Sequence, residues 1–368
     1  MKKVCISVIS LILALSAVSY AAGPANKELE SQMKGALFMN PEDPKANLDL
    51  GIFYFDKGIY DEAADYFDNV IRVAPNTEFS AKAAEYICRI DKSGKPKRFG
   101  LNLTLGGQYD SNVILNHTDS PLPSNISNKS DWRGIIYLNS KFNLFMNERA
   151  EASIGYNFYQ SLHTELTDYN LMQHQAELKT RLAVSDSLSL GAAYSFEYLY
   201  LGGDDYDYAH TLSPSLTISE GKGFSTIIEY RYRDAHFMDA PLFLDNSERT
   251  GSNNLIGVTQ NIPIGSRITA RIGYSYDVDS TKRDYWDYTG NKGFAGIRIN
   301  LPYDFMIDLY SEYYRKGYEG SNPISGLSRR DILRAYSGSI SKAITDSFII
   351  TIGQIYIDNN SNIDVYTY

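Results

Sequence analysis

The stretch Arg267-Ile-Thr-Ala-Arg-Ile-Gly-Tyr-Ser-Tyr-Asp277 decides the fold class, because its apolar and polar residues alternate. Successive side chains of a strand point to opposite faces. One face of this predicted strand is apolar or aromatic and carries Ile268, Ala270, Ile272, Tyr274 and Tyr276. The opposite face is polar and carries Arg267, Thr269, Arg271, Ser275 and Asp277. A tilted strand of about ten residues is long enough to cross a membrane.

The same alternation recurs from Phe99 almost to the end of the chain. We expect strands over Phe99–Tyr109, Trp132–Leu144, Ala150–Leu162, Asn170–Ala183, Leu188–Leu201, Tyr208–Ser219, Phe224–Asp234, Asn253–Ile262, Arg267–Val278, Gly293–Leu301, Phe305–Arg315, Ile332–Ile344 and Phe348–Asp358. Their apolar faces often end in tyrosines, which favour the membrane–water interface. Residues 96–368 are therefore predicted to form an antiparallel transmembrane β-barrel of about 14 strands, a fold of the Gram-negative outer membrane.

The predicted connections alternate in length. Long polar loops such as Ala235–Ser252 alternate along the chain with short turns such as Pro263–Ser266. Short turns of such barrels face the periplasm and long loops face the outside, so the N-terminal residues are expected in the periplasm. Single-chain bacterial barrels usually have an even number of strands, and an unpaired edge in lipid is costly. Val365-Tyr-Thr-Tyr368 is interpreted as the start of a closing strand that is missing, with a C-terminal truncation favoured.

Residues 1–21 have the pattern of a signal peptide. Lys2 and Lys3 precede the apolar run Val4–Val18, and Ser19-Tyr-Ala21 is a small-x-small cleavage site. Cleavage after Ala21 leaves Cys88 as the one cysteine of the mature chain. We therefore expect no intrachain disulfide, and we expect Cys88 to be a small buried apolar residue on a helix.

Residues 22–95 show helical spacing, with prolines at the breaks. The segment from Pro44 to Pro75 resembles a tetratricopeptide repeat, and it carries the positions of that motif at Leu50, Gly51, Tyr54, Ala63, Phe67 and Pro75. Lys27–Asn40 and Thr77–Ile90 resemble helices of neighbouring repeats. The resemblance implies a periplasmic module that binds protein through a groove around Asn47, Tyr54 and Tyr60. A plug or a spacer is the alternative.

The first predicted strand ends in Gly106-Gly-Gln-Tyr-Asp-Ser-Asn-Val113. The motif Tyr109, Asp110, Ser111 and Asn112 resembles the start of the barrel in surface lipoprotein assembly modifiers, which join periplasmic repeats to a barrel of about 14 strands. This resemblance implies delivery of a lipoprotein, or another periplasmic protein cargo, to the cell surface. An exopolysaccharide export porin has the same parts, and a simple diffusion porin is a third possibility.

The polar faces of the predicted strands define a charged lumen. Its candidate residues are Glu177, Lys179, Arg181, Glu229, Arg231, Arg233, Arg271 and Arg298. Both signs occur, so ion pairs across the wall that close the lumen are an alternative to a path for charged cargo.

Other classes of function receive little support from the sequence. A net charge of -9 does not favour nucleic-acid binding. The common hydrolase, zinc-protease and phosphate-loop motifs are missing from the sequence, and the five histidines are dispersed. We therefore expect no enzyme activity, no cofactor and no metal, with the lipid bilayer as the environment.

Overall fold

The computed structural model describes residues 8–17, 37, 43–75, 77–93, 98–117, 121–122, 126–146, 149–345 and 347–368. The chain divides into two compact units. Residues 18–99 contain the helices, and residues 1–17 together with 100–368 contain the strands.

The helical unit consists of α2 (Pro44–Asp56), α3 (Tyr60–Val73) and α4 (Glu78–Ser93). Asp43 caps α2, because its Oδ1 accepts hydrogen bonds from the backbone N–H groups of Lys45 and Ala46. Pro44 occupies the first turn, where a missing N–H costs nothing. The helix pair that the sequence predicts between Pro44 and Pro75 is present in the structure.

A small apolar core joins the three helices. It is formed by Leu48, Leu50, Phe53, Tyr54, Ala63, Phe67, Val70, Ala83 and Ile90. Gly51 lets α2 approach α3 closely, because a Cβ at this position would lie 2.6 Å from Cε1 of Phe67. Of the predicted helix Lys27–Asn40, the structure describes Leu37 alone, which packs against this core.

The burial predicted for Cys88 is wrong, because the structure leaves this cysteine exposed on α4. Its neighbours Ile87 and Ile90 turn toward the core instead. At 3.6 residues per turn, a shift of one position is enough to move a side chain from the buried to the exposed face.

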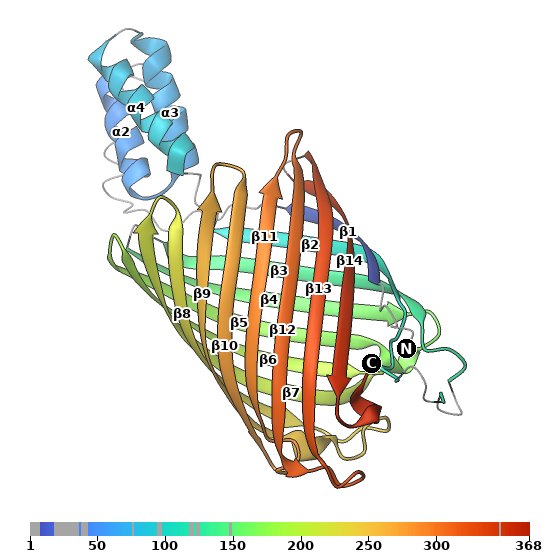
Figure 1. The fold of residues 1–368 in the computed structure, drawn as a ribbon. Helices are drawn as coiled ribbons and strands as arrows, with labels where there is room; N and C mark the ends of the chain where they lie inside the picture. Colours follow the sequence, from blue (N-terminus) through green and yellow to red (C-terminus); the bar gives the residue numbers. More distant parts are fainter. Residues whose placement is uncertain are drawn as a thin grey trace. The chain divides into compact units, whose positions relative to one another are not determined.

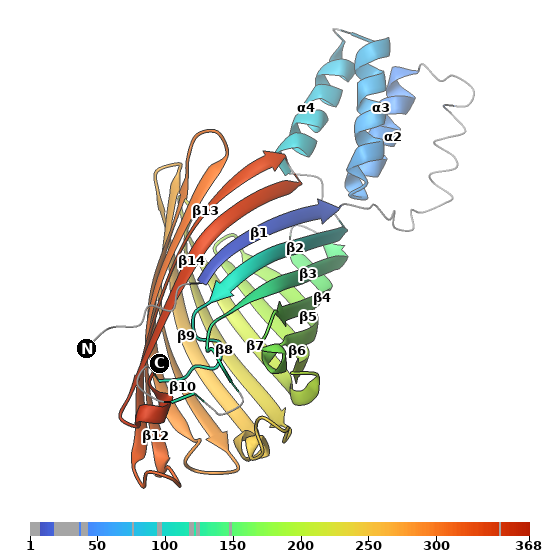
Figure 2. The ribbon, with the colours of Figure 1, turned by 90° about the vertical axis from the view of Figure 1, so that its right-hand side faces the viewer.

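The strands of the second unit form a closed barrel in which they follow one another in sequence order (Figures 1 and 2). The ladders of hydrogen-bonded strands run antiparallel from β3 through β14 to β1 and β2. The strands are β1 (Val8–Ala17), β2 (Phe99–Asp110), β3 (Asp131–Met146), β4 (Ala150–His163), β5 (Leu171–Ser185), β6 (Leu188–Leu201), β7 (Asp204–Gly221), β8 (Phe224–Phe237), β9 (Gly251–Ile264), β10 (Ile268–Thr281), β11 (Tyr288–Asn300), β12 (Phe305–Ser321), β13 (Ser328–Thr345) and β14 (Phe348–Ser361). The predicted antiparallel barrel is confirmed, and β1 is its fourteenth described strand.

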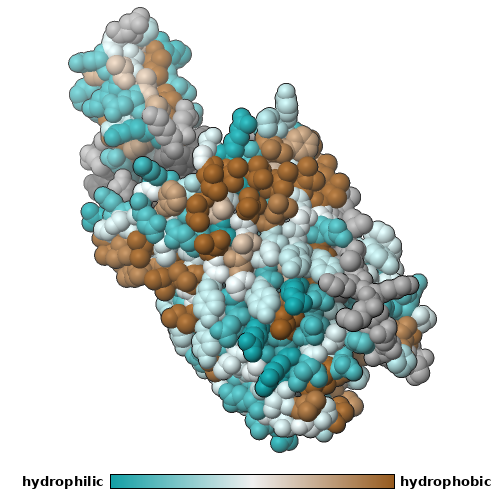
Figure 3. All heavy atoms as spheres, in the orientation of Figure 1, coloured by the Kyte–Doolittle hydropathy of each residue, from teal (hydrophilic) through white to brown (hydrophobic). Residues whose placement is uncertain are grey.

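The barrel wall has two chemically different faces. On β10, Ile272 and Tyr274 are each 50% exposed on the outside, whereas Ser275 and Asp277 are buried on the lumen side. Figure 3 shows apolar side chains gathered in a belt across the visible outer face, toward the end with the short turns. The alternation predicted for this stretch is therefore present as an apolar outer face and a polar inner face.

The closing strand does not come from the end of the chain that the sequence suggested. β1 inserts between β14 and β2, with Leu13 opposite both Ile350 and Leu105. Val365 and Tyr366 lie in a 3₁₀ turn, and Tyr368 folds back to exchange backbone hydrogen bonds with Asn359. The expected start of a closing strand at Val365–Tyr368 is thus wrong.

The segment of β1 is also the apolar middle of the predicted signal peptide. A ten-residue apolar run satisfies both patterns, so the sequence does not separate them. Cleavage after Ala21 would remove β1, and the two roles therefore exclude each other in a mature chain. The signal peptide remains a prediction.

Candidate functional site in the barrel lumen

Charges near the short-turn end of the lumen are paired. Lys141 Nζ lies 2.6 Å from Glu151 Oε1, and Arg181 Nε lies 3.9 Å from the second oxygen of the same carboxylate. Lys179 pairs with Glu177 beside it on β5. Across the barrel, Arg298 Nε lies 2.8 Å from Asp308 Oδ1. Four predicted lumen residues, Glu177, Lys179, Arg181 and Arg298, therefore belong to ion pairs that largely cancel one another.

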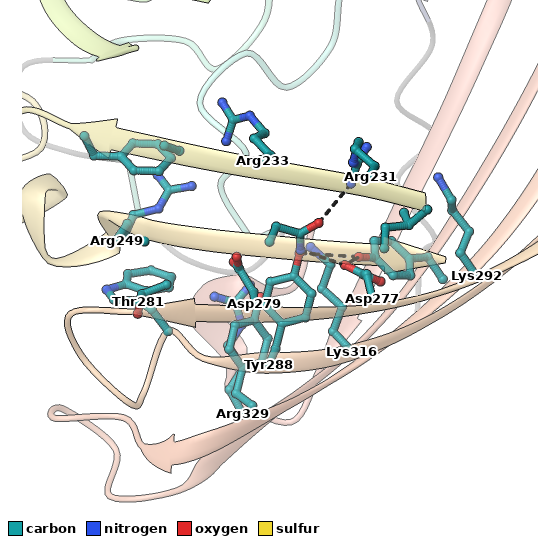
Figure 4. Close-up of a pocket in the computed structure, with 18 residues that line it drawn as sticks. Arg231, Arg233, Arg249, Asp277, Asp279, Thr281, Tyr288, Lys292, Lys316 and Arg329 are labelled. Atoms are coloured by element: carbon teal, nitrogen blue, oxygen red, sulfur yellow. Dashed lines mark hydrogen bonds between the residues drawn. The ribbon is translucent and has the colours of Figure 1, made fainter. Parts of the chain in front are cut away.

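Nearer the long loops, β8 to β13 surround a cavity of about 470 Å³, which we call the lumen cavity. Its lining includes six cationic side chains, Arg231, Arg233, Arg249, Lys292, Lys316 and Arg329. The lining also holds two carboxylates, Asp277 and Asp279, the polar residues Asn253 and Thr281, and five aromatic residues, Phe237, Trp286, Tyr288, Tyr314 and Tyr318. Figure 4 shows the charged groups converging from neighbouring strands.

Arg233 is held by two carboxylates on neighbouring strands. Its Nη2 atom lies 2.9 Å from Oδ2 of the buried Asp207 and 3.2 Å from Oε1 of Glu197. These ion pairs fix the guanidinium on the wall between β6, β7 and β8. The charge of Arg233 is therefore largely neutralised by its two partners.

Arg231 begins a chain of hydrogen bonds around the cavity (Figure 4). Its Nη2 donates to Asn253 Oδ1 at 3.0 Å, and Asn253 Nδ2 donates to Asp277 Oδ2 at 3.2 Å. The Tyr314 hydroxyl donates to the same oxygen of Asp277 at 2.8 Å. Asp277 is thus held by neutral donors rather than by an arginine or a lysine.

Cations and aromatic rings alternate around the rest of the cavity. The Lys316 ammonium lies 4.5 Å from the ring centre of Tyr288 and 4.7 Å from that of Tyr314. The Arg249 guanidinium lies 4.5 Å from the Phe237 ring centre and 5.4 Å from that of Trp286. Such contacts hold the cations in place without neutralising them.

The lumen cavity carries an excess of positive charge. Within the part of the chain that the structure describes, Arg231, Arg249 and Lys316 have no carboxylate oxygen within 4.0 Å. Nε of Arg231 is also buried without a hydrogen-bond partner among these residues. An unsatisfied buried donor is costly.

A second cavity of about 640 Å³, which we call the outer vestibule, adjoins the lumen cavity through the shared residues Arg249 and Trp286. Loop residues line it, among them Phe243, Tyr285 and Ile324. The loop that carries Arg249 is anchored by the buried Asn246, whose Nδ2 donates to the carbonyls of Tyr206 and Met238.

The predicted lumen residues divide between the two ends. Arg231 and Arg233 line the lumen cavity, and Arg271 lies 5.5 Å from the ring centre of Phe294 outside it. Glu229 is on the same face of β8 and approaches Gly257 of β9. The structure therefore does not gather the eight predicted residues into one site.

The motif at Tyr109–Asn112 ends β2 and begins the first long loop. Asn112 is buried, and its side chain exchanges two hydrogen bonds with the backbone of Asn116. Its N–H donates to Asp110 Oδ1, while the Tyr109 ring contacts Trp132. Ser111 connects these residues. The observed contacts of the motif are those of a loop cap.

The predicted groove residues of the helical unit are mostly internal. Tyr54 is buried and stacks on Tyr66 at 5.5 Å, and the partly buried Tyr60 meets Phe55 edge to face. Asn47 is buried as well, but it borders a groove of about 520 Å³. The remaining lining of this groove consists of Glu62, Asp65, Tyr66, Asp68, Asn69 and Arg72.

Sequence reasoning missed most of the lumen cavity. Lys316 and Tyr318 seemed to follow the strand that ends at Arg315, whereas β12 continues to Ser321. Their spacing from Tyr314 by two and four residues is the signal that extends the polar face. Arg249 and Trp286 come from loops, where no periodicity identifies them.

No protein-family model matches this chain, and no curated protein matches it either. Among solved structures, it is similar to the KdgM porin with 9% identity and a TM-score of 0.31, covering 61% of this chain and 96% of that one. It is also similar to the Pseudomonas putida toluene transporter TodX, with 10% identity and a TM-score of 0.36, covering 71% of this chain and 79% of that one. The similarity to CdiB from Escherichia coli has 9% identity and a TM-score of 0.36, and it covers 70% of this chain and 59% of that one. At these low values, nothing about the function of those proteins transfers to this chain.

None of the described helices is both long and apolar enough to cross a membrane. The described histidine, cysteine, aspartate and glutamate side chains form no group of three or more placed to hold a metal ion.

Proposed function

We propose that this chain is an outer-membrane transport protein of a Gram-negative bacterium, with the barrel as the conduit and the helical unit in the periplasm. The observation that carries the proposal is the two-faced wall of the closed barrel. Exposed apolar and tyrosine side chains cover its outside, and charged and polar side chains face its lumen. A lipid exterior and a hydrated interior satisfy both faces.

The cargo has two candidates. A lipoprotein or another periplasmic protein is favoured by the helical unit, where close contact between Gly51 and Phe67 matches the tetratricopeptide pattern. The acidic groove beside Asn47 offers such a cargo a surface rich in carboxylates, from Glu62, Asp65 and Asp68. In this scheme the helices receive the cargo and pass it to the barrel.

A polysaccharide export or diffusion porin is favoured by the lumen itself. The lumen cavity combines fixed cations with aromatic rings, which suits a hydrophilic solute more than a folded lipoprotein. This candidate needs no receptor on the helices.

Deletion of residues 22–95 separates the two candidates. If the helices receive the cargo, a surface lipoprotein of the same cell will lose its exposure to external protease while the barrel still inserts. A second variant replaces Glu62, Asp65 and Asp68 by the corresponding amides, which removes the charges of the acidic groove and leaves the helices in place. Unchanged surface delivery in both variants would reject a receptor role.

Conductance in a planar lipid bilayer tests the porin candidate. A steady current from the purified full chain is expected for a diffusion porin. Absence of any current at several salt concentrations would mean that ion pairs and loops close the lumen, as the paired charges near the short turns allow.

A further inference from the structure

We propose that the lumen cavity binds an acidic saccharide, that is, a sugar chain that carries carboxylate groups. This proposal rests on the proposed transport function only in so far as the bound saccharide is then carried through the barrel. Binding itself requires only the folded barrel, so the two proposals can fail separately.

The charge of the cavity selects an anion. Three of the six cations are paired in the wall, Arg233 with Asp207, Lys292 with Glu312 and Arg329 with Asp331. The other three face the carboxylates of Asp277 and Asp279, which leaves a local excess of positive charge although the chain as a whole has a net charge of -9. Arg231, Arg249 and Lys316 keep their charges without a carboxylate partner in the described structure. A fixed local excess of positive charge inside a low-dielectric wall attracts and holds anions.

The two carboxylates argue against a bare inorganic anion. Asp277 and Asp279 would repel phosphate or sulfate, but they accept hydrogen bonds from sugar hydroxyls. Asn253, Tyr288 and Tyr314 add neutral donors and acceptors around the same space. A ligand with many hydroxyls and a few carboxylates satisfies both sets of groups.

The aromatic residues suit rings rather than a flexible chain. Trp286, Tyr288 and Tyr318 line the lumen cavity, each with a cation over its ring. Aromatic side chains are surfaces against which the apolar faces of sugar rings can pack. The volume of about 470 Å³ lies within the range of small-molecule sites, about 300–1,000 Å³, and holds a short stretch of a longer chain.

The outer vestibule supplies the way in. It meets the lumen cavity at Arg249 and Trp286, so a chain that extends through both would pass over these two side chains. Its own lining adds Tyr285 and Arg283, but Arg283 Nε lies 3.0 Å from Oε1 of Glu248, so the vestibule contributes rings and polar groups rather than free cations.

The test uses two oligosaccharides that differ only in one substituent of each sugar ring. Tetraglucuronate and cellotetraose share the β-1,4 linkage and the ring, and the first carries a carboxylate where the second has a hydroxymethyl group. The chain has 2 tryptophans, so the substitution Trp132→Phe leaves Trp286 as the one tryptophan in the purified full-length protein. We expect tetraglucuronate to change Trp286 fluorescence in a saturable way, with cellotetraose binding roughly tenfold or more weakly.

Matched variants assign the effect to the cavity. Lys316→Gln and Arg231→Gln should each weaken tetraglucuronate binding roughly tenfold, because each removes a charged hydrogen-bond donor. Arg181→Gln removes a lumen cation near the short turns and should leave affinity unchanged. The shift between folded and heat-denatured mobility on a gel checks that every variant keeps its barrel.

Three results would overturn the proposal: no binding of tetraglucuronate, equal binding of both sugars, or displacement by sulfate at concentrations no higher than those of tetraglucuronate. Bilayer current with no binding would remove the saccharide site and keep the channel. Saturable binding with no current would keep the site and remove the channel.

Discussion

Arg233 and Asp207 form an ion pair inside the barrel wall, with 2.9 Å between Nη2 and Oδ2. Asp207 is 3% exposed, so its carboxylate has lost its contacts with water, and the Arg233 guanidinium replaces them. Glu197, 3.2 Å away, shares the same guanidinium nitrogen and ties three neighbouring strands together.

We expect Arg233→Met to lower the free energy of unfolding by roughly 3–5 kcal/mol, because it leaves a buried carboxylate unpaired. Urea unfolding in lipid vesicles, followed by gel mobility, measures the change. Arg298→Met is the control, since its pair with Asp308 is 56% and 35% exposed and should cost about 0–1 kcal/mol. Equal losses in the two variants would contradict the structural role of Arg233.

Gly51→Ala should destabilise the helical unit despite the better helix propensity of alanine. The new Cβ would meet the fully buried Phe67 ring, and such overpacking costs roughly 1–3 kcal/mol. Thermal melting of the full chain, followed by the helical signal in circular dichroism, reports this loss. Ala84→Leu on the exposed face of α4 is the control, and Phe67→Leu should partly restore the Gly51→Ala variant.

The N-terminus of the protein purified from outer membranes decides between the two roles of residues 8–17. We expect mass spectrometry to find Ala22 as the first residue, as the signal-peptide pattern predicts. An intact Met1 would instead keep β1 in the wall.

A pair of engineered cysteines reports whether β1 is present between β14 and β2. Leu105 and Ile350 both face Leu13 in the ladders, so β1 separates them by two strand spacings, or about 9–10 Å. A disulfide needs Cα atoms about 4.4–6.8 Å apart. In a Cys88→Ser background, Leu105→Cys with Ile350→Cys can be oxidised to a disulfide only where β1 has left.

Asp239 gives the loop before Arg249 a defined response to acid. The amide and hydroxyl of Ser247 donate to its two carboxylate oxygens and hold the pKa of Asp239 below its ordinary value. A lowered pKa in the fold adds stability above the ordinary carboxyl pKa, about 3.9, and this stability is lost as pH falls through the lower folded value. Hydrogen exchange of the Ser247 amide, corrected for its intrinsic rate, should therefore show constant protection from pH 7 to about pH 5 and a loss below about pH 4.

Asp239→Asn is the control for that response. It removes the titrating group, so protection of Ser247 should be lower at neutral pH and should not depend on pH. A wild-type protein whose protection already falls between pH 7 and pH 5 would assign the response to another group.

Much of the architecture could be predicted from local pattern. The alternation in Arg267–Asp277 depends only on the two-residue period of a strand, and β10 carries it with the expected faces outward and inward. Gly51 and Phe67 likewise fall at positions of a known helical motif, and they meet in the structure. The position of Cys88 was wrong by a single step around a helix.

The sequence by itself determined the period of the strands, the order of short and long connections and the pairing of two helices, because each depends on residues close together in the chain. Only the tertiary structure decided that Arg249 and Trp286 from two loops meet Lys316 from β12 around one cavity. Closure of a barrel brings distant segments together, and no local periodicity records which ones will meet.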